Sequence, residues 1–333
     1  MKTEVVLDVK NLVKHFPLMS KGIFLKKEVG LVRAVDGVSF SVNRGETFGL
    51  VGESGCGKTS TARAILYLDP PTSGEIYFDN QEVGKVFKSK NKAEILKLRR
   101  KMQYVFQNPY ASLDPRMTVS DIIMEPLMIH KHIAKDKWID KLYELLDLVG
   151  LEDYHAERYP HEFSGGQRQR ICIARALAVE PEFLIADEPV ASLDVSVRAQ
   201  ILNLLQDLQR KLNITYLYIS HDLSTVRQIC HKVAVMYLGN FVELAETEEL
   251  FTSPLHPYTK ALLSAIPVPD PETKITRIML SGEVPSPINP PPGCGFNPRC
   301  AYKKEKMCAE TAPKLTDVGN GHLVACQEAS KLR

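Results

Sequence analysis

A glycine-rich octapeptide that follows a short apolar segment constrains the fold of this chain more than any other feature. It reads Gly52-Glu53-Ser54-Gly55-Cys56-Gly57-Lys58-Thr59 and fits the spacing G-x-x-x-x-G-K-[ST] of a phosphate-binding loop, or P-loop. Such a loop joins a buried strand to a helix, so we expect a strand over 47–51 and a helix over 59–68. The glycines let the backbone wrap around phosphates. Lys58 should reach the β- and γ-phosphates, and the Thr59 hydroxyl should bind Mg²⁺.

The loop predicts a set of nucleotide-binding residues. Cys56 is expected to be a small filler that contributes its backbone N–H, and the alternative is a redox-sensing thiol. The predicted set is Gly52, Ser54, Gly55, Cys56, Gly57, Lys58, Thr59 and Ser60.

A second glycine-rich turn lies far downstream of the P-loop. Phe163-Ser164-Gly165-Gly166-Gln167 precedes a segment with helical spacing over 165–179. A turn that opens a helix directs backbone N–H groups at an anion. We therefore expect Ser164, Gly165, Gly166 and Gln167 to bind phosphate as well.

Two adjacent carboxylates follow the most apolar strand candidate. Residues 183–186 read Phe-Leu-Ile-Ala, as a parallel strand buried on both faces should, and Asp187 and Glu188 come next. Ligands bind at the carboxyl ends of strands in open α/β sheets. Asp187 is expected to hold Mg²⁺, and Glu188 to polarise the attacking water as general base.

Apolar spacing along the rest of the chain alternates between strand and helix. Strands are expected over 5–9, 34–42, 74–78 and 214–219, and helices over 119–130, 135–149 and 195–212. This order predicts an α/β core with a helical insert between the P-loop and strand 183–186. Proline becomes frequent after residue 253, with six prolines between Pro285 and Pro298, so a domain boundary is expected near residue 254.

Charge and hydropathy exclude several classes of protein. The 42 basic and 40 acidic residues give a net charge of +2, which lacks the basic excess of nucleic-acid binding proteins. No apolar run reaches the roughly 18 residues that span a bilayer, and the first residues lack the apolar core of a signal peptide. We expect a cytosolic protein that reaches a membrane only through partners.

With these motifs in this order, residues 4–250 resemble the ATP-binding cassette (ABC) family. The resemblance implies an ABC-type P-loop ATPase core, a mixed sheet with a RecA-like subdomain, and a helical subdomain at about 108–180. It also implies ATP hydrolysis between two cassettes, each completing the other's site with its second glycine-rich turn. Residue by residue, it implies that Phe16 stacks on adenine, Gln107 contacts Mg²⁺, Asp194 lies in a loop crossing the dimer interface, and His221 contacts the γ-phosphate. Phe163 stands where the family more often has leucine and should pack inward.

Three further features resemble the ATPase subunits of bacterial dipeptide and oligopeptide importers. They are a lysine-rich insert at 17–34, the stretch His256-Pro257-Tyr258-Thr259, and the tail rich in proline and cysteine. The stretch is expected to be a turn feeding a helix over 258–266, with His256 packed rather than acting as a ligand. The resemblance implies an ATPase domain over 1–254 and a C-terminal extension over 255–333.

The same resemblance implies partners and a location. The partners are a second cassette (a sister subunit or another copy), two membrane permeases and, indirectly, an extracytoplasmic peptide-binding protein, and the chain would work at the cytoplasmic face of the membrane. An importer ATPase for another substrate such as nickel, and a soluble ABC ATPase outside transport, remain alternatives.

Four of the seven cysteines, Cys294, Cys300, Cys308 and Cys326, fall within the last 40 residues. A disulfide framework is not expected in a reducing compartment, and a segment too small for its own core is often stabilised by metal. Zinc usually takes paired C-x-x-C ligands, which are absent here. The irregular spacing and the importer resemblance favour a [4Fe–4S] cluster, with zinc or no metal as alternatives.

Overall fold

The computed structural model describes residues 4–19, 28–267 and 277–331. The chain divides into two compact units, and each is described by itself. We call residues 1–6, 42–47 and 83–220 the helical part, and residues 7–41, 48–82 and 221–333 the P-loop part. The predicted domain bounds, 1–254 and 255–333, stay a prediction.

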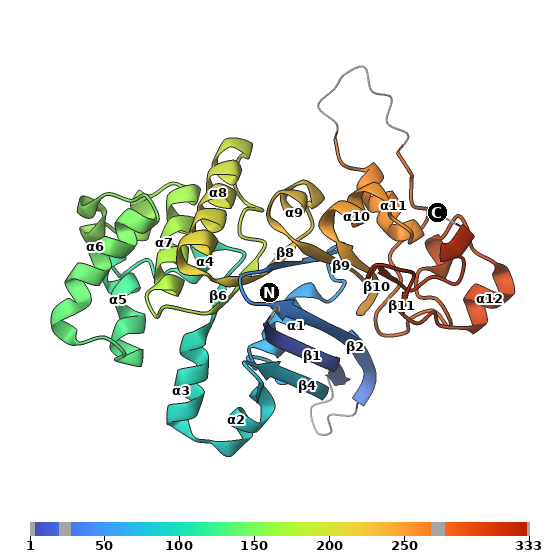
Figure 1. Cartoon of the computed structure of the whole chain (residues 1–333), viewed down its shortest axis with the longest axis horizontal. Coiled ribbons are helices and arrows are strands. Elements are labelled where there is room, and N and C mark those ends of the chain that lie inside the picture. Colours follow the sequence, from blue (N-terminus) through green and yellow to red (C-terminus); the bar gives the residue numbers. More distant parts are fainter. Residues whose placement is uncertain (1–3, 20–27, 268–276, 332–333) are drawn as a thin grey trace. The chain divides into compact units, whose positions relative to one another are not determined.

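The helical part combines three parallel strands with helices. Strand β7 lies between β6 and β8, and both of its pairings are parallel. Helices α5, α6 and α7 pack against one another (Figure 1). The elements are α2 (Val83–Ser89), α3 (Lys92–Lys101), β6 (Met102–Val105), α4 (Pro109–Ser112), α5 (Val119–His130), η1 (Lys135–Lys137), α6 (Trp138–Leu148), η2 (Asp153–Glu157), η3 (Pro160–Glu162), α7 (Gly165–Leu177), β7 (Phe183–Asp187), α8 (Val195–Leu212) and β8 (Thr215–Ser220).

Local capping explains where the main helices of this part begin. Thr118 and Asp121 form a reciprocal capping box before α5. The Asp194 carboxylate accepts the Val197 N–H at the start of α8. The predicted helices 119–130 and 195–212 are confirmed, and the helical insert lies where it was expected.

The P-loop part contains two sheets. One has the order β2-β1-β4-β5, and Figure 1 shows β1 between β2 and β4. In the other, β9 pairs in parallel with β3 and antiparallel with β10, followed by β12 and β11. Apart from strand ends that fall in the helical part, the elements are β1 (Val5–Met19), β2 (Glu28–Asn43), β3 (Thr47–Val51), α1 (Lys58–Ile65), β4 (Ser73–Phe78), β5 (Gln81–Glu82), α9 (Leu223–Ile229), β9 (Lys232–Tyr237), β10 (Asn240–Glu246), α10 (Thr247–Thr252), α11 (Pro257–Ser264), η4 (Asn297–Arg299), α12 (Glu305–Glu310), β11 (Thr316–Asp317), β12 (Leu323–Val324) and η5 (Ala329–Lys331).

The mixed sheet and its helices confirm the predicted fold class of the core, and the separate C-terminal extension stays a prediction. Strand 47–51 is β3, and all five of its residues are buried. Strands β1 and β2 are longer than expected and enter the predicted insert 17–34 from both sides. Residues 20–27 of that insert lie outside the described residues.

Candidate functional site

The P-loop connects β3 to α1 and encloses the amine of Lys58. Gly57 has φ 113°, and a Cβ there would lie 2.1 Å from the Ala34 carbonyl oxygen, so only glycine fits. Lys58 is 5% exposed, and its Nζ donates to the carbonyls of Gly52 (2.7 Å) and Glu53 (3.1 Å). The loop therefore holds a positive charge where phosphate oxygens would bind.

Cys56 is buried inside this loop. Burial raises the pKa of its thiol, and the neighbouring Lys58 only partly opposes that effect. A neutral, buried thiol is a poor nucleophile. The side chain thus fits the filler role better than that of a redox sensor.

Two further predicted contacts of the nucleotide, Phe16 and His221, lie within the P-loop part. Phe16 lies on β1 and is partly exposed, with the Lys14 ammonium 4.7 Å from its ring centre. His221 is exposed and follows the last residue of β8. The partly exposed ring of Phe16 suits a contact with adenine, and the exposed imidazole of His221 suits a contact with phosphate. Both roles stay predictions.

Asp187 and Glu188 lie in the helical part, where β7 ends. Asp187 is 2% exposed and accepts a hydrogen bond from the Tyr104 hydroxyl at 2.5 Å. Glu188 has φ 47°, an unusual conformation for a residue other than glycine, and its N–H donates to Ile219 O at 2.9 Å. Strain of this kind persists where the surrounding structure fixes it and often marks a functional position.

Gln107 and Glu188 are in direct contact, although 81 residues separate them. Gln107 Nε2 donates to Glu188 Oε2 at 2.7 Å, and the Gln107 side chain is exposed. Two of the three predicted catalytic residues are therefore brought together within one part. Tyr104 was not predicted. It lies beside Asp187 because β6 pairs with β7, and no motif in the sequence marks that pairing.

The second glycine-rich turn begins α7 with a reciprocal cap. Ser164 Oγ accepts the Gln167 N–H at 3.3 Å, and Gln167 Oε1 accepts the Ser164 N–H at 3.1 Å. Ser164 remains exposed, and Phe163 packs inward as expected. The start of α7 thus presents backbone N–H groups and the positive end of the helix dipole to an approaching anion.

The loop that carries Asp194 lies against this turn. A Cβ on Gly166 would lie 2.3 Å from Val197 Cγ1, and one on Gly165 would lie 3.3 Å from Leu193 Cδ2. Hydrogen bonds from the Val197 amide and the Ser196 hydroxyl lower the pKa of Asp194. The predicted interface loop and the predicted phosphate-binding turn therefore form one surface of the helical part.

The stretch His256-Pro257-Tyr258-Thr259 starts α11, as expected. His256 Nδ1 accepts the Tyr258 N–H at 3.1 Å, and burial lowers the pKa of this histidine to about 4. A buried, neutral side chain that caps a helix agrees with the expected packing role.

The four C-terminal cysteines line a single cavity, together with residues such as His256 and Phe296. The amide N–H groups of Phe296, Tyr302 and Glu328 donate to the sulfurs of Cys294, Cys300 and Cys326, and the Lys304 amide lies 3.5 Å from Cys308 Sγ. All seven cysteines are free thiols.

Burial opposes the ionisation of three of these thiols. Burial raises the pKa of Cys294 to about 11 and also raises the pKa of Cys300 and Cys326. Among the described residues, no group of three or more His, Cys, Asp or Glu side chains meets the geometry for holding a metal ion.

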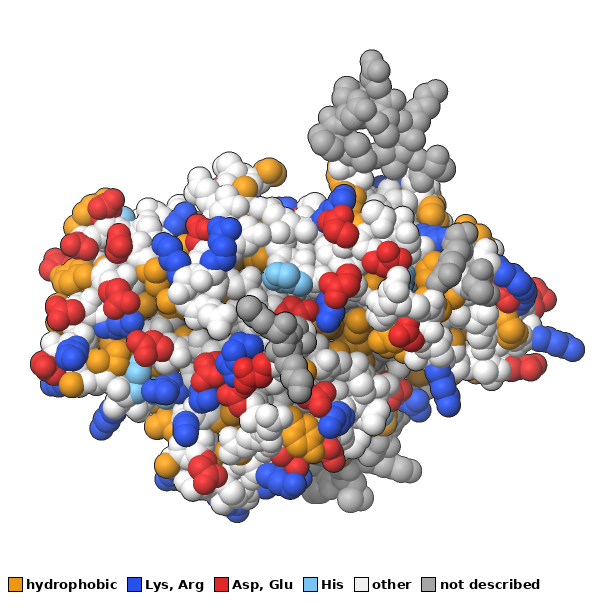
Figure 2. Space-filling model, in the orientation of Figure 1, with side chains coloured by type: hydrophobic (Ala, Val, Ile, Leu, Met, Phe, Trp, Pro, Cys, Tyr) orange, Lys and Arg blue, Asp and Glu red, His pale blue; other side chains and the backbone are white. Residues whose placement is uncertain are grey.

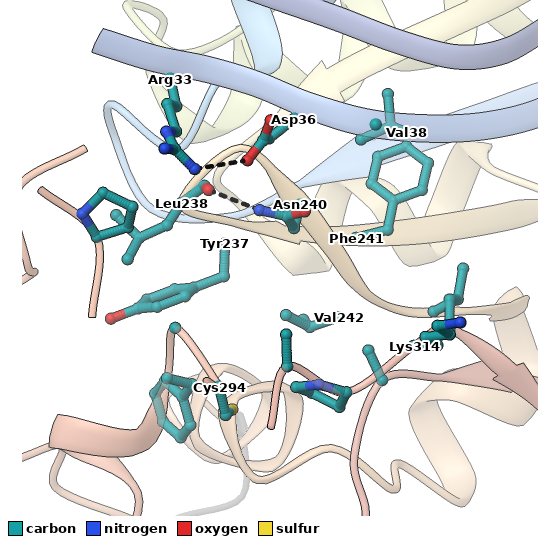
Figure 3. A pocket seen from close by; sticks show the side chains of 18 of the residues that line it. Arg33, Asp36, Val38, Tyr237, Leu238, Asn240, Phe241, Val242, Cys294 and Lys314 are labelled. Atoms are coloured by element: carbon teal, nitrogen blue, oxygen red, sulfur yellow. Dashed lines mark hydrogen bonds and ion pairs between the residues drawn. The ribbon is translucent and has the colours of Figure 1, made fainter. Parts of the chain in front are cut away.

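A separate cavity of about 1000 Å³ lies in the P-loop part (Figure 3). Its wall includes Tyr237, Lys314 and the ion pair between Arg33 and Asp36, whose N···O distance is 3.7 Å. Of the predicted site residues, Cys294 alone lines it. This cavity is therefore not the predicted nucleotide site.

Acidic and basic side chains are interspersed over the described residues of the face in Figure 2. No helix within the described ranges is both long and apolar enough to cross a bilayer.

Two family models match the chain. Residues 35–191 match the ABC transporter model, which contains the P-loop, the second glycine-rich turn and both carboxylates. Residues 242–308 match the oligopeptide/dipeptide transporter C-terminal region, which contains the His256 stretch and three of the four cysteines. The two matches agree with the order of motifs in the sequence.

Curated proteins resemble the chain over nearly its whole length. The oligopeptide transport ATP-binding protein AppF of Bacillus subtilis is 50% identical over 325 residues, covering 97% of each chain. The dipeptide transport ATP-binding protein DppF of Escherichia coli is 50% identical over 322 residues, covering 96% of this chain and 93% of its own.

A solved structure supports the fold. The dimeric ATP-binding cassette MJ0796, in a post-hydrolysis state bound to ADP and Pi, superposes with a TM-score of 0.62 at 28% identity, over 72% of this chain and 98% of that one. Together with the near full-length relatives, these findings place the chain in the ABC transporter family, among the oligopeptide and dipeptide transport ATP-binding proteins.

Proposed function

We propose that this chain hydrolyses ATP to drive the import of dipeptides or oligopeptides across the cytoplasmic membrane. The observation that carries the proposal is the P-loop with Lys58 enclosed in it, in a chain that is 50% identical to peptide transport ATP-binding proteins over nearly its full length. A general ATPase would not require the C-terminal region that matches the oligopeptide/dipeptide transporter model.

Each of the two parts contains residues that suit phosphoryl transfer to water. Lys58 and the P-loop amides bind the phosphates, while the Thr59 hydroxyl and the Asp187 carboxylate are the hard oxygen ligands that Mg²⁺ prefers. Bound there, Mg²⁺ would neutralise charge on the phosphates. Glu188 orients and deprotonates the attacking water, and the Gln107 amide fixes the Glu188 carboxylate at 2.7 Å.

A second cassette completes the site in this proposal. The N-terminus of α7 and the exposed Ser164 face outward from the helical part, beside the Asp194 loop. An anion-binding turn on a surface suits the nucleotide of a neighbouring subunit. The partner cassette is a sister subunit or a second copy of this chain, and the assembly docks on two permeases at the cytoplasmic face of the membrane.

Uptake measurements in a strain that lacks the chain test this function. Wild type should restore uptake of a labelled dipeptide or oligopeptide, and Glu188→Gln should not. Purified Glu188→Gln should still bind ATP but hydrolyse it at least about a hundredfold more slowly, because the general base is lost. Glu144→Gln is the matched control, since Glu144 is exposed and pairs with Lys141 at 3.0 Å.

The same strain separates the alternatives. Restored nickel uptake without peptide uptake would assign the chain to another importer. Normal uptake of both substrates in its absence would favour an ATPase outside transport. Peptide uptake with Glu188→Gln at the wild-type rate would contradict the assigned base.

We further propose that the four C-terminal cysteines bind a [4Fe–4S] cluster. Two observations support this: all four line one cavity, and each sulfur has a backbone amide beside it. Amide hydrogen bonds to the sulfurs are one of the means by which proteins tune such clusters. A cluster several atoms wide holds its thiolates farther apart than a single ion does, and the donor set of four thiolates fits its needs.

Anaerobic purification followed by iron and sulfide analysis tests the cluster. About four irons and four sulfides per chain are expected, with loss of both in Cys308→Ser. Cys230→Ser is the matched control, because Cys230 is buried next to Gly49 and does not line that cavity. A folded, colourless and metal-free wild-type protein would refute the cluster. Bound zinc in place of iron would show that the four cysteines form a zinc site instead.

A further inference from the structure

The C-terminal region holds the second residue of the P-loop, Glu53, from two sides. Arg299 Nη1 donates to Glu53 Oε2 at 2.7 Å, and Arg299 Nη2 donates to Glu53 Oε1 at 3.1 Å. The Glu53 backbone N–H donates to the Tyr258 hydroxyl at 2.9 Å. Both the carboxylate and the amide of one P-loop residue therefore contact residues more than 200 positions away.

The guanidinium of Arg299 is buried beside a cluster of aromatic rings. Arg299 is 8% exposed and lies 5.9 Å from the centre of the Tyr237 ring. The rings of Tyr237, Tyr258 and Phe296 pack on one another at centroid distances of 4.8 to 5.4 Å. The Arg299 side chain is buried and the Glu53 side chain is 29% exposed, and their bidentate geometry belongs to the strong class of such contacts.

Arg299 also connects the P-loop to the cysteine-rich segment. It ends the short helix η4 and directly precedes Cys300 in the chain. The position of its side chain therefore depends on how the segment from Cys294 to Cys300 is folded.

Within the P-loop, Glu53 is the residue on which the following turn is built. Its carbonyl accepts the Cys56 N–H at 3.3 Å and Lys58 Nζ at 3.1 Å. Fixing Glu53 fixes the direction of the amides that follow it. A loop held in its binding conformation loses less conformational entropy when a phosphate binds.

Arg299 has a second effect, through charge. An unpaired carboxylate beside a phosphate-binding loop would repel the phosphates, and Coulomb interactions at a few ångströms are substantial near a protein surface. The guanidinium of Arg299 neutralises this carboxylate.

We propose that Arg299 is a positioning residue of the P-loop: through its bidentate ion pair with Glu53 it makes ATP binding depend on the folding of the four-cysteine segment. The inference rests on the proposed ATPase function and adds a residue outside the family's nucleotide motifs. By linkage, bound nucleotide should in turn stabilise the folded C-terminal segment.

Equilibrium binding of MgATP to the full-length chain tests the inference. Arg299→Gln should weaken binding about tenfold, since it leaves the Glu53 carboxylate unpaired. Glu53→Gln should weaken it less, because charge and partner disappear together. The double variant should bind like Glu53→Gln, and Arg299→Lys should recover part of the loss. A residue that only stabilises the fold would not give this order.

Steady-state hydrolysis gives a second readout. Arg299→Gln should raise KM for ATP and leave kcat within about twofold, because the residue acts on the loop and not on the reacting atoms. Arg227→Gln is the matched control: Arg227 pairs with Glu248 at 3.1 Å on α10 and should leave both parameters unchanged.

Each outcome decides a separate question. If wild type does not bind MgATP, the proposed function fails. If wild type binds and Arg299→Gln matches Arg227→Gln, or if the losses of Arg299→Gln and Glu53→Gln add in the double variant, the inference about Arg299 is wrong. A lowered unfolding midpoint in Arg299→Gln does not obscure the result, because the comparison of Glu53→Gln with the double variant still tests the pair.

Discussion

Glu243 on β10 is a fully buried carboxylate, and its replacement by glutamine tests how the C-terminal region is attached to the core. Its two oxygens accept three hydrogen bonds, from the Leu255 N–H (2.7 Å), the His256 N–H (2.9 Å) and His322 Nε2 (2.8 Å). Residues on both sides of the proline-rich tail therefore converge on one side chain.

The expected loss of stability follows from these contacts. Glutamine keeps one carbonyl oxygen but places an NH₂ donor where the second oxygen accepts a hydrogen bond. Removing one partner of a buried, hydrogen-bonded ion pair costs about 3–5 kcal/mol. We expect a loss near the lower end, about 3 kcal/mol, because one acceptor survives. An unfolding entropy of about 2.1 cal/mol/K per residue gives about 0.7 kcal/mol per degree for 333 residues, so the unfolding midpoint should fall by about 4 °C.

The pH dependence of this loss has a definite sign. The Glu243 hydrogen bond raises the pKa of His322 above its ordinary value. A raised pKa adds stability that is fully present below about pH 6.5, the unfolded value, and is lost as pH rises through the folded pKa. Burial lowers the pKa of His256 to about 4, so protonation of that residue opposes folding as pH falls from about 6.5 to 4. Buried thiols also titrate as pH approaches 9, but they are present in both proteins, so the difference between wild type and Glu243→Gln from pH 6.5 to 9 reports on His322.

Thermal unfolding of both proteins across that range is the assay. The difference between wild type and Glu243→Gln should be largest at pH 6.5 and smaller at pH 9, where a neutral His322 still donates one hydrogen bond. Glu246→Gln is the control, because Glu246 ends the same strand, is exposed and pairs with Lys232 at 3.6 Å. A difference below about 1 kcal/mol, or one that does not change with pH, would refute this account of Glu243.

Three further substitutions have specific expected outcomes. Gly57→Ala places a methyl group 2.1 Å from the Ala34 carbonyl oxygen and should weaken equilibrium MgATP binding by at least about tenfold. Unchanged binding would contradict the P-loop geometry. Tyr104→Phe removes the hydroxyl that donates to Asp187 and should raise the Mg²⁺ concentration for half-maximal ATP hydrolysis about tenfold; no shift would argue against Asp187 as a metal ligand. Gly166→Ala brings a methyl group 2.3 Å from Val197 Cγ1 and should reduce ATP hydrolysis while MgATP binding to the isolated chain persists; equal loss of both would contradict a role in a partner's site.

Local spacing was enough to predict the residues of the phosphate-binding motifs. A P-loop needs glycines at fixed offsets because of backbone geometry, and Gly57 shows that requirement directly with its φ of 113°. The apolar strand before Asp187 and the cap of α7 at Ser164 are likewise local features, and both occur where they were expected. The assignment of these residues to ATP chemistry stays a prediction.

Long strands were harder to predict, because irregularities break the alternation of apolar and polar residues. Strand β1 runs over Val5–Met19, yet its pattern was followed only to residue 9. Asn11 has φ 46°, and the pairing with β4 changes register between Lys10 and Val13. Such a bulge shifts the later side chains to the opposite face, so a period of two no longer describes the strand.

Contacts between distant residues left no signal in the sequence. Arg299 and Glu53 are 246 positions apart, and a Pro- and Cys-rich tail offers many cations that could pair with a P-loop carboxylate. The packing of three aromatic rings decides which one does, because it removes Arg299 from water and leaves the Glu53 carboxylate as its bidentate partner. In the function and inference proposed above, the P-loop motif supplies the atoms that touch phosphate, and the contacts of the C-terminal region with Glu53 hold one end of that loop. A substitution that disturbs either Tyr258 or Arg299 should therefore alter ATP binding without touching the nucleotide.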